Sequence, residues 1–297
     1  MTFRKGVGCM LTVIVPAAIA SPVMLSGQEA ELVAPGVIST DGGEAFPALG
    51  PNGTALYFST HGSGWSDHKL VVAHREPEGW GKPQALPFSN RHNDRAPRPS
   101  PDGSQLYFSS DRPLPGEVSP GDYNIWKVER RSDGEWGEPT PLPAPVNTER
   151  DEYHASVTAD GTLFYAGREW PGGYGKSDIY RATFDGQAYG QPENLGPSIN
   201  DALSQPDLYI SSDGRLMILA ITDHPKGLGG DDLYVSYFRH GAWTAPENLG
   251  PGVNSTEYEY GPTVSPDGRY LYFTSHRRGP GDIYRIALSD LLNDPGH

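Results

Sequence analysis

Residues 100–108 read Ser-Pro-Asp-Gly-Ser-Gln-Leu-Tyr-Phe, a tight-turn sequence followed directly by a short aromatic strand. An Asn-Gly or Asp-Gly pair before a short hydrophobic strand occurs five times in the chain, with its glycine at Gly53, Gly103, Gly161, Gly214 and Gly268. These glycines recur at intervals of 50 to 58 residues. Such an interval is too long for one hairpin and fits a four-stranded propeller blade. The chain is therefore predicted to be a repeat protein.

The Asn-Gly and Asp-Gly pairs are expected to form type I′ turns between two antiparallel strands. Both central residues of that turn have positive φ, which Asn, Asp and Gly tolerate best. Each pair then marks the hairpin between the first and second strands of a blade.

The second repeat shows the remaining strands most clearly. Residues 105–109 leave the turn, residues 124–128 form a third strand, and residues 134–142 contain the fourth. The fourth strand recurs as an aromatic residue followed three positions later by proline, as in Trp80 and Pro83. Proline has no N–H to donate, so this strand is expected at the outer edge of its blade.

The fifth repeat has no fourth strand of its own. Residues 31–37 (ELVAPGV) near the N-terminus resemble residues 247–253 (ENLGPGV) at the end of the fourth repeat. We therefore predict that residues 31–36 pair with the strand at 282–287 and close the ring. The expected fold is all-β, a single β-propeller of five four-stranded blades spanning residues 28–288; a six-bladed ring is the alternative.

Residues 1–20 have a different composition. Arg4 and Lys5 precede an apolar run that ends in Ala18-Ile19-Ala20, the pattern of a secretory signal peptide. The run of about a dozen apolar residues is short for a membrane span. We expect cleavage between residues 20 and 30, a periplasmic or secreted mature chain without a membrane span, and a short C-terminal tail at 289–297. Cys9 is the only cysteine, so no disulfide is expected.

The charge balance excludes several classes of partner. Lys and Arg number 23 against 37 Asp and Glu, which gives a net charge of −14. A chain with this excess of acid is a poor ligand for nucleic acid or anionic lipid. A monomer is expected. The expected partners are a protein, a peptide or a glycan bound on a loop face.

Two of the repeats resemble a known family. Ser100-Pro101-Asp102-Gly103 and Ser265-Pro266-Asp267-Gly268 each precede Leu-Tyr-Phe, and Asp282-Ile283-Tyr284 follows the second of them. This pattern resembles the TolB-type (WD40-like) β-propeller repeat, and the resemblance covers residues 30–288. It implies the propeller fold. Function follows less directly, since such repeats occur in periplasmic scaffolds, in the propellers of peptidases and in some lyases.

A recurring polar position begins the innermost strand of each blade, nine residues before the turn glycine. It is occupied by Glu44, Asp94, Glu152, Gln205 and Glu259. These side chains are expected to ring one mouth of the central channel, and His154 is expected to point the same way as Glu152 because side chains alternate along a strand. The four acids and His154 are the catalytic candidates. The commoner role of a recurring acid is to accept hydrogen bonds from backbone or from a neighbouring Arg.

The loops between the second and third strands are expected on the same face. They supply candidate ligand-binding residues: His61, Trp65, Asp111, Arg112, Arg168, Trp170, Asp223, His224, His276 and Arg277. Trp65 and Trp170 fall outside the repeat pattern, so they are candidates for stacking on a sugar or a peptide. No cofactor is required by any motif; a divalent cation such as Ca or Mn is the one candidate, with His61, His154, His224 and His276 as its ligands. These four come from different blades and lack short ligand spacing.

Two functional hypotheses remain open from the sequence. The favoured one is an exported, non-enzymatic propeller that binds a protein, peptide or other ligand on its acidic loop face. The alternative is a carbohydrate-active enzyme with its site in the central funnel, either a glycoside hydrolase or a metal-assisted polysaccharide lyase. Four near-equivalent acids favour binding, because catalytic acids need different surroundings to separate their pKa values.

Overall fold

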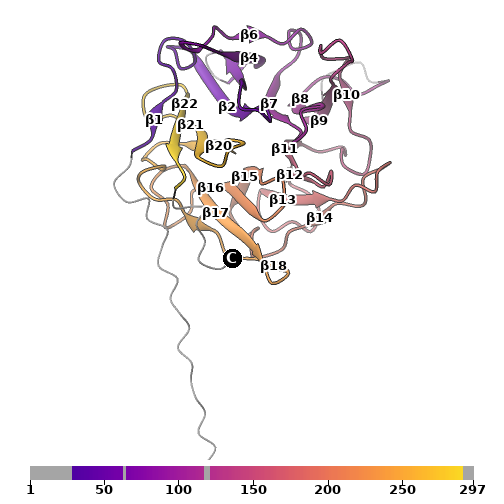
Figure 1. Cartoon of the computed structure of the whole chain (residues 1–297). Coiled ribbons are helices and arrows are strands. Elements are labelled where there is room, and N and C mark those ends of the chain that lie inside the picture. Colours follow the sequence, from indigo (N-terminus) through magenta and orange to yellow (C-terminus); the bar gives the residue numbers. More distant parts are fainter. Residues whose placement is uncertain (1–28, 63–64, 117–120, 290–297) are drawn as a thin grey trace, which may run out of the picture.

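The computed structural model describes residues 29–62, 65–116 and 121–289; the predicted signal peptide and residues 290–297 of the predicted tail lie outside these ranges. Every regular element in the described ranges is a β-strand, and the strands form five antiparallel sheets around a central axis (Figure 1). The prediction of an all-β propeller with five four-stranded blades is confirmed. No helix in these ranges is long and apolar enough to cross a membrane.

Each blade is an antiparallel sheet whose first strand lies nearest the axis. Blade 1 contains β2 (Gly43–Leu49), β3 (Ala55–His61), β4 (Lys69–Glu76), β5 (Gly79–Trp80) and β6 (Gln84–Ala85). Blade 2 contains β7 (Asp94–Pro99), β8 (Gln105–Ser110), β9 (Asn124–Glu129) and β10 (Thr140–Pro141). Blade 3 contains β11 (Glu152–Val157), β12 (Leu163–Arg168), β13 (Ser177–Ala182) and β14 (Glu193–Asn194). Blade 4 contains β15 (Ser204–Ile210), β16 (Leu216–Thr222), β17 (Asp231–Arg239), β18 (Ala242–Trp243) and β19 (Glu247–Asn248). Blade 5 contains β20 (Glu259–Val264), β21 (Tyr270–Ser275), β22 (Asp282–Ala287) and β1 (Glu31–Leu32).

The N-terminal strand closes the ring as the sequence predicted. β1 pairs with β22, with Glu31 opposite Arg285 and Leu32 opposite Tyr284. β19 occupies the same outer position in blade 4, where Asn248 lies opposite Tyr234. The likeness between residues 31–37 and 247–253 therefore reflects two equivalent outer strands. This pairing covers what would otherwise be an open sheet edge.

The turns between the first and second strands are not type I′. In residues 100–105 only Gly103 has positive φ, at 73°, and its N–H donates to the Ser100 carbonyl at 2.8 Å. Ser, Pro, Asp and Gly thus occupy the four positions of a type I turn, where proline at the second and glycine at the fourth are favoured. The expectation of positive φ at the preceding Asp is wrong because five residues, Ser100 to Ser104, separate the strands, and not two.

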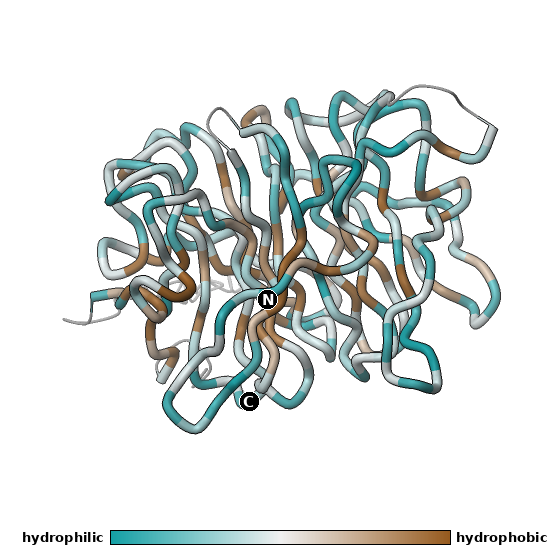
Figure 2. Tube along the Cα trace, turned by 90° about the horizontal axis from the view of Figure 1, so that it is seen from above, coloured by the Kyte–Doolittle hydropathy of each residue, from teal (hydrophilic) through white to brown (hydrophobic). Residues whose placement is uncertain are grey.

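The core lies between neighbouring sheets. Large side chains of the middle strands, such as Phe58, Phe108, Tyr165 and Phe273, are fully buried. Figure 2 shows hydrophobic segments within the strands and mostly hydrophilic segments in the loops at the two ends. Burial of these faces is the main source of stability, since the described residues contain no cysteine.

A β-bulge interrupts the innermost strand of every blade. The register shifts between Ala45 and Ala48 in β2 and at the matching place in β7, β11, β15 and β20. Phe46, Ala96, His154 and Gly261 occupy the bulges with φ between 52° and 64°. The bulge N–H often bonds the neighbouring blade; that of His154, for example, donates to Ser109 Oγ at 3.0 Å. A bulge re-aims the side chain it carries.

Candidate functional site: an aromatic pocket at one mouth of the channel

The starts of the innermost strands surround a pocket of about 560 Å³ at one end of the central channel. Its lining comes from strands of all five blades and from adjoining loops: Phe46, Trp65, Arg95, Tyr153, His154, Pro206, Asp207, Asp231, Tyr258, Tyr260 and His276. The bulges decide much of this lining, because Phe46 and His154 sit at bulge positions of β2 and β11.

Aromatic rings form most of the wall. Trp65 stacks between His61, with ring centroids 4.6 Å apart, and His276, at 5.9 Å. The indole also lies 6.2 Å from Phe46 and 5.5 Å from Tyr260. Trp65 is nevertheless 40% exposed and has φ of 60°. The indole is thus held in place by its neighbours and remains accessible from solvent.

The two histidines of the pocket are neutral near pH 7. Burial lowers the pKa of His276, whose Nε2 is 2.9 Å from the Tyr260 hydroxyl. Burial lowers the pKa of His154 well below its usual value. His154 Nδ1 is 2.6 Å from the Pro206 carbonyl oxygen, so that nitrogen carries the proton. Its Nε2 is then an unprotonated acceptor, and it has no protein partner among the described residues.

Two carboxyl groups reach the pocket. Asp207 is 1% exposed, and its Oδ2 accepts a hydrogen bond from the Gly261 N–H at 2.5 Å. Its Oδ1 lies 3.7 Å from His154 Nδ1. Burial raises the pKa of Asp207 to about 7, against the opposing effect of the Arg98 charge. Burial also raises the pKa of Asp231, which accepts from Thr222 Oγ1 at 2.6 Å.

One cation lies in the wall. The Arg95 guanidinium stands 3.9 Å from the ring centroid of Tyr123 and 5.7 Å from that of Tyr153. Its Nε is buried and has no hydrogen-bond partner among the described residues. Arg95 can therefore donate to a ligand oxygen while the aromatic faces stabilise its charge.

The structure directs the recurring acids away from this pocket. Three of them accept hydrogen bonds from the N–H and hydroxyl of the residue four positions earlier: Glu44 from Thr40, Glu152 from Thr148 and Glu259 from Ser255. Burial raises the pKa of Glu44, and that of Glu152 to about 7. The acids are thus acceptors that fix the loop before each innermost strand.

The other two recurring positions, Asp94 and Gln205, also have hydrogen-bond partners within the protein. Asp94 is fully buried and receives two hydrogen bonds from Arg112 Nη2, at 2.6 and 2.7 Å. Gln205 Nε2 donates to Asp201 Oδ1 at 2.8 Å. None of the five ring residues lines the pocket. The expectation that His154 points the same way as Glu152 is wrong, because the bulge breaks the alternation between them.

The remaining candidates divide between the pocket and other places. Trp65, His154 and His276 line the pocket, and His61 contacts it through the Trp65 stack. The others have partners elsewhere: Asp111 with Asn93, Arg168 with Asp151, Trp170 with Glu152 and Tyr180, His224 with Tyr234, and Arg277 with Glu259; Asp223 has its N–H bonded to the Gly230 carbonyl.

The metal-site hypothesis finds no support in the arrangement of these side chains. His224 packs on Tyr234, with ring centroids 5.2 Å apart, and does not line the pocket with His154 and His276. Within residues 29–62, 65–116 and 121–289, no group of three His, Cys, Asp or Glu side chains is arranged to hold a metal ion.

Several pocket residues were not predicted from the sequence: Phe46, Arg95, Tyr153, Asp207, Asp231, Tyr258 and Tyr260. A signal for some of them exists. The position two residues after each ring acid holds Phe46, Ala96, His154, Asp207 and Gly261, five different residue types in otherwise similar repeats. A variable position inside a repeated frame is where individual function can be carried without loss of the fold.

Comparison with known proteins supports the fold class alone. No family model matches the chain, and no curated protein matches it. Solved structures of similar fold include a thermostable family-43 glycoside hydrolase, at 14% identity and a TM-score of 0.61, covering 88% of this chain and 92% of that one. Another is described as a glycoside hydrolase, at 12% identity and a TM-score of 0.59, covering 88% and 90%. The protein is a β-propeller.

Proposed function

We propose that the protein binds a saccharide unit in the aromatic pocket. The observation that carries this proposal is the combination of stacked rings with unpartnered polar atoms. Trp65 offers an exposed ring face, while Arg95 Nε and His154 Nε2 offer a donor and an acceptor. A sugar has apolar C–H faces that pack on aromatic rings and hydroxyls that both donate and accept.

The size and charge of the pocket favour the same ligand class. Its volume of about 560 Å³ falls in the range of small-molecule sites. Its histidines are neutral, Asp207 is partly protonated near pH 7, and Arg95 is the cation of its wall. A neutral, hydroxylated ligand fits this balance better than the cation that an acidic funnel would attract. The two glycoside hydrolases of similar fold agree with a saccharide ligand.

Binding is tested by calorimetry with a panel of mono- and oligosaccharides. For a saccharide that binds the unmodified protein, Trp65→Ala is expected to lower the affinity by about tenfold or more, since stacked aromatic contacts dominate such sites. Tyr174→Ala is the matched control, because Tyr174 is 49% exposed and does not line the pocket. Absence of binding across the panel, or equal losses in both variants, would contradict the proposal.

Hydrolysis of the bound saccharide is a second candidate, favoured by Asp207. A carboxyl with a pKa of about 7 beside the pocket holds a proton that a leaving group can take. Asp207→Asn would then abolish release of reducing sugar and leave saccharide affinity within about threefold. No release from either protein leaves binding as the function, and equal release from both would show that Asp207 is not the proton donor.

We also propose that the mature chain acts outside the cytoplasm, as a periplasmic or secreted protein. The predicted signal peptide and the resemblance to TolB-type repeats support this location. N-terminal sequencing of protein recovered from the cell exterior or periplasm should begin between residues 20 and 30. A protein that begins at Met1 and stays in the cytoplasm would contradict it.

A further inference from the structure

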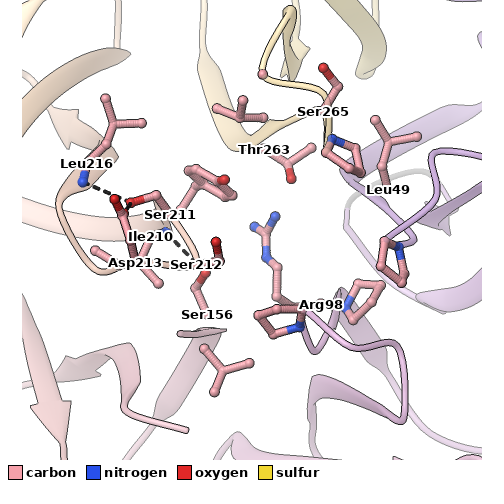
Figure 3. Close-up of a pocket in the computed structure, with 18 of the residues that line it drawn as sticks. Leu49, Arg98, Ser156, Ile210, Ser211, Ser212, Asp213, Leu216, Thr263 and Ser265 are labelled. Atoms are coloured by element: carbon pink, nitrogen blue, oxygen red, sulfur yellow. Dashed lines mark hydrogen bonds between the residues drawn. The ribbon is translucent and has the colours of Figure 1, made fainter. Parts of the chain in front are cut away.

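A second cavity, of about 520 Å³, lies at the opposite end of the channel. The innermost strands start at the aromatic pocket and end here, so the lining comes from strand ends such as Pro99, Val157 and Val264 and from the adjoining turns. Figure 3 shows this ring of residues with the Arg98 side chain at its centre. We call it the turn-face cavity.

Arg98 is a buried cation with unused donors. The residue is 7% exposed. Its Nη2 donates to the carbonyl oxygens of Pro262, at 3.1 Å, and Leu208, at 3.5 Å. Its Nε and Nη1 are buried and have no hydrogen-bond partner within the described residues. A guanidinium in this state is costly unless an anion or another acceptor completes it.

The protein supplies only part of the counter-charge. Asp207 is the carboxyl that most favours the charged form of Arg98, and desolvation works against that charge. Asp207 is itself held partly neutral by burial, and its Oδ2 is used by the Gly261 N–H. Both hydrogen-bonded partners of the guanidinium are uncharged carbonyls.

We propose that the turn-face cavity binds a small monocarboxylate with an apolar body, whose carboxylate pairs with the Arg98 guanidinium. Guanidinium and carboxylate form strong charge-assisted hydrogen bonds. The Thr263 and Ser156 side chains line the cavity as further polar groups. One buried cation matches one negative charge, since the rim residues Asp213 and Arg215 oppose each other in sign.

The apolar residues in the cavity wall are the reason for proposing a ligand with an apolar body. Four prolines, Pro51, Pro99, Pro101 and Pro266, line the cavity together with aliphatic side chains that include Leu49 and Ile210. These groups offer hydrophobic contact and no side-chain donor. A phosphate, which carries a second charge and no apolar part, would leave them unused.

The test compares benzoate with benzamide, two probes of the same shape that differ in charge. Calorimetry on the full mature chain is expected to show benzoate binding about tenfold or more tightly than benzamide. Equal affinities, or no binding of benzoate, would overturn the proposal. This comparison needs no variant and holds even if a substitution at Arg98 prevents folding.

Two variants assign the binding to the buried cation. Arg98→Met keeps the length of the side chain and removes its charge, and should remove the preference for benzoate over benzamide. Arg215→Met, which alters a cation at the rim of the same cavity, should change benzoate affinity by less than about threefold. If Arg215→Met loses the preference and Arg98→Met keeps it, the carboxylate binds the rim and the proposal is wrong.

A saturating saccharide in the aromatic pocket should leave benzoate affinity unchanged, and competition between them would place benzoate at the other end.

Discussion

The Ser39 hydroxyl donates to the carbonyl oxygen of Ile283 and accepts from the N–H of the same residue, at 3.1 Å each, across 244 residues of sequence. Asn254 clamps Leu233 in the same way in blade 4, through Nδ2 and Oδ1. The seam, where β1 of the N-terminal segment pairs with β22, is therefore held by the same kind of side-chain clamp as the outer strands of blade 4.

This relationship predicts how the seam can be weakened. Ser39→Ala leaves the buried N–H of Ile283 without its partner and removes one of the two donors to the Ile283 C=O, which keeps the Val33 N–H at 2.9 Å. The free energy of unfolding should fall by about 1–3 kcal/mol. Glu31→Gln should cost less than about 1 kcal/mol, because the Glu31–Arg285 pair of 2.6 Å is solvent-exposed. Urea unfolding of both variants measures the difference. A larger loss from Glu31→Gln would show that the exposed pair, and not the buried clamp, holds the seam.

The recurring acids should act as structural acceptors. Glu259 receives hydrogen bonds from the Ser255 N–H, the Ser255 hydroxyl and the Ser275 hydroxyl. Glu259→Gln replaces one acceptor oxygen by an NH2 group that faces donors. The free energy of unfolding should fall by about 1–3 kcal/mol, and the melting temperature should fall with it. Glu257→Gln, at an exposed position, is the control and should melt like the unmodified protein. A rise in melting temperature for Glu259→Gln would indicate relief of repulsion between acids.

Asp207 should make stability depend on pH. Its pKa is raised from 3.8 to about 7, so the folded state favours the protonated form. The stability it contributes is fully present below about pH 4 and is lost as pH rises through 7. Relative to Asp207→Asn, which stays neutral, the unmodified protein should lose stability between pH 4 and 7, on the order of a few kcal/mol. Urea unfolding at pH 4.5, 6 and 8 tests this, and a difference independent of pH would contradict it.

The turn glycines should differ in their tolerance of alanine. Gly53 and Gly103 both have positive φ, at 69° and 73°. A Cβ at Gly53 meets no atom within 4 Å, so Gly53→Ala should cost only the left-handed backbone penalty of about 1–2 kcal/mol. A Cβ at Gly103 would lie 2.8 Å from Pro51 Cγ, so Gly103→Ala should cost more. Thermal unfolding ranks the two, and equal losses would mean that Pro51 moves aside freely.

The fold was readable because it is encoded in repetition. The spacing of the Gly53 and Gly103 turns, and the second copy of the outer strand at residues 31–37, each depend on backbone chemistry that every blade shares. Residues that recur in every blade indicate backbone geometry that recurs in every blade. The number of blades and the closure of the ring could therefore be predicted from the sequence.

The candidate site was only partly readable for the same reason. Glu152 was expected at the channel mouth because an acid recurs at this position in other blades. A recurring residue more often has a structural role, and Glu152 accepts hydrogen bonds from Thr148 and from the Trp170 indole. The bulge that separates it from His154 leaves no simple mark in one sequence. Trp65, which breaks the repeat, was the better guide to the pocket.

The pairing of β1 with β22 brings the first and last strands of the ring together, so the ring does not depend on the blade at which the chain begins. Ser289 and Glu29 flank strands that lie side by side, so a linker between them could replace the present ends. New ends at the exposed hairpin of His240 and Gly241, between β17 and β18, would then divide blade 4 as blade 5 is divided now. The position of the chain ends can therefore be changed by circular permutation, and the two cavities on the axis should keep their lining.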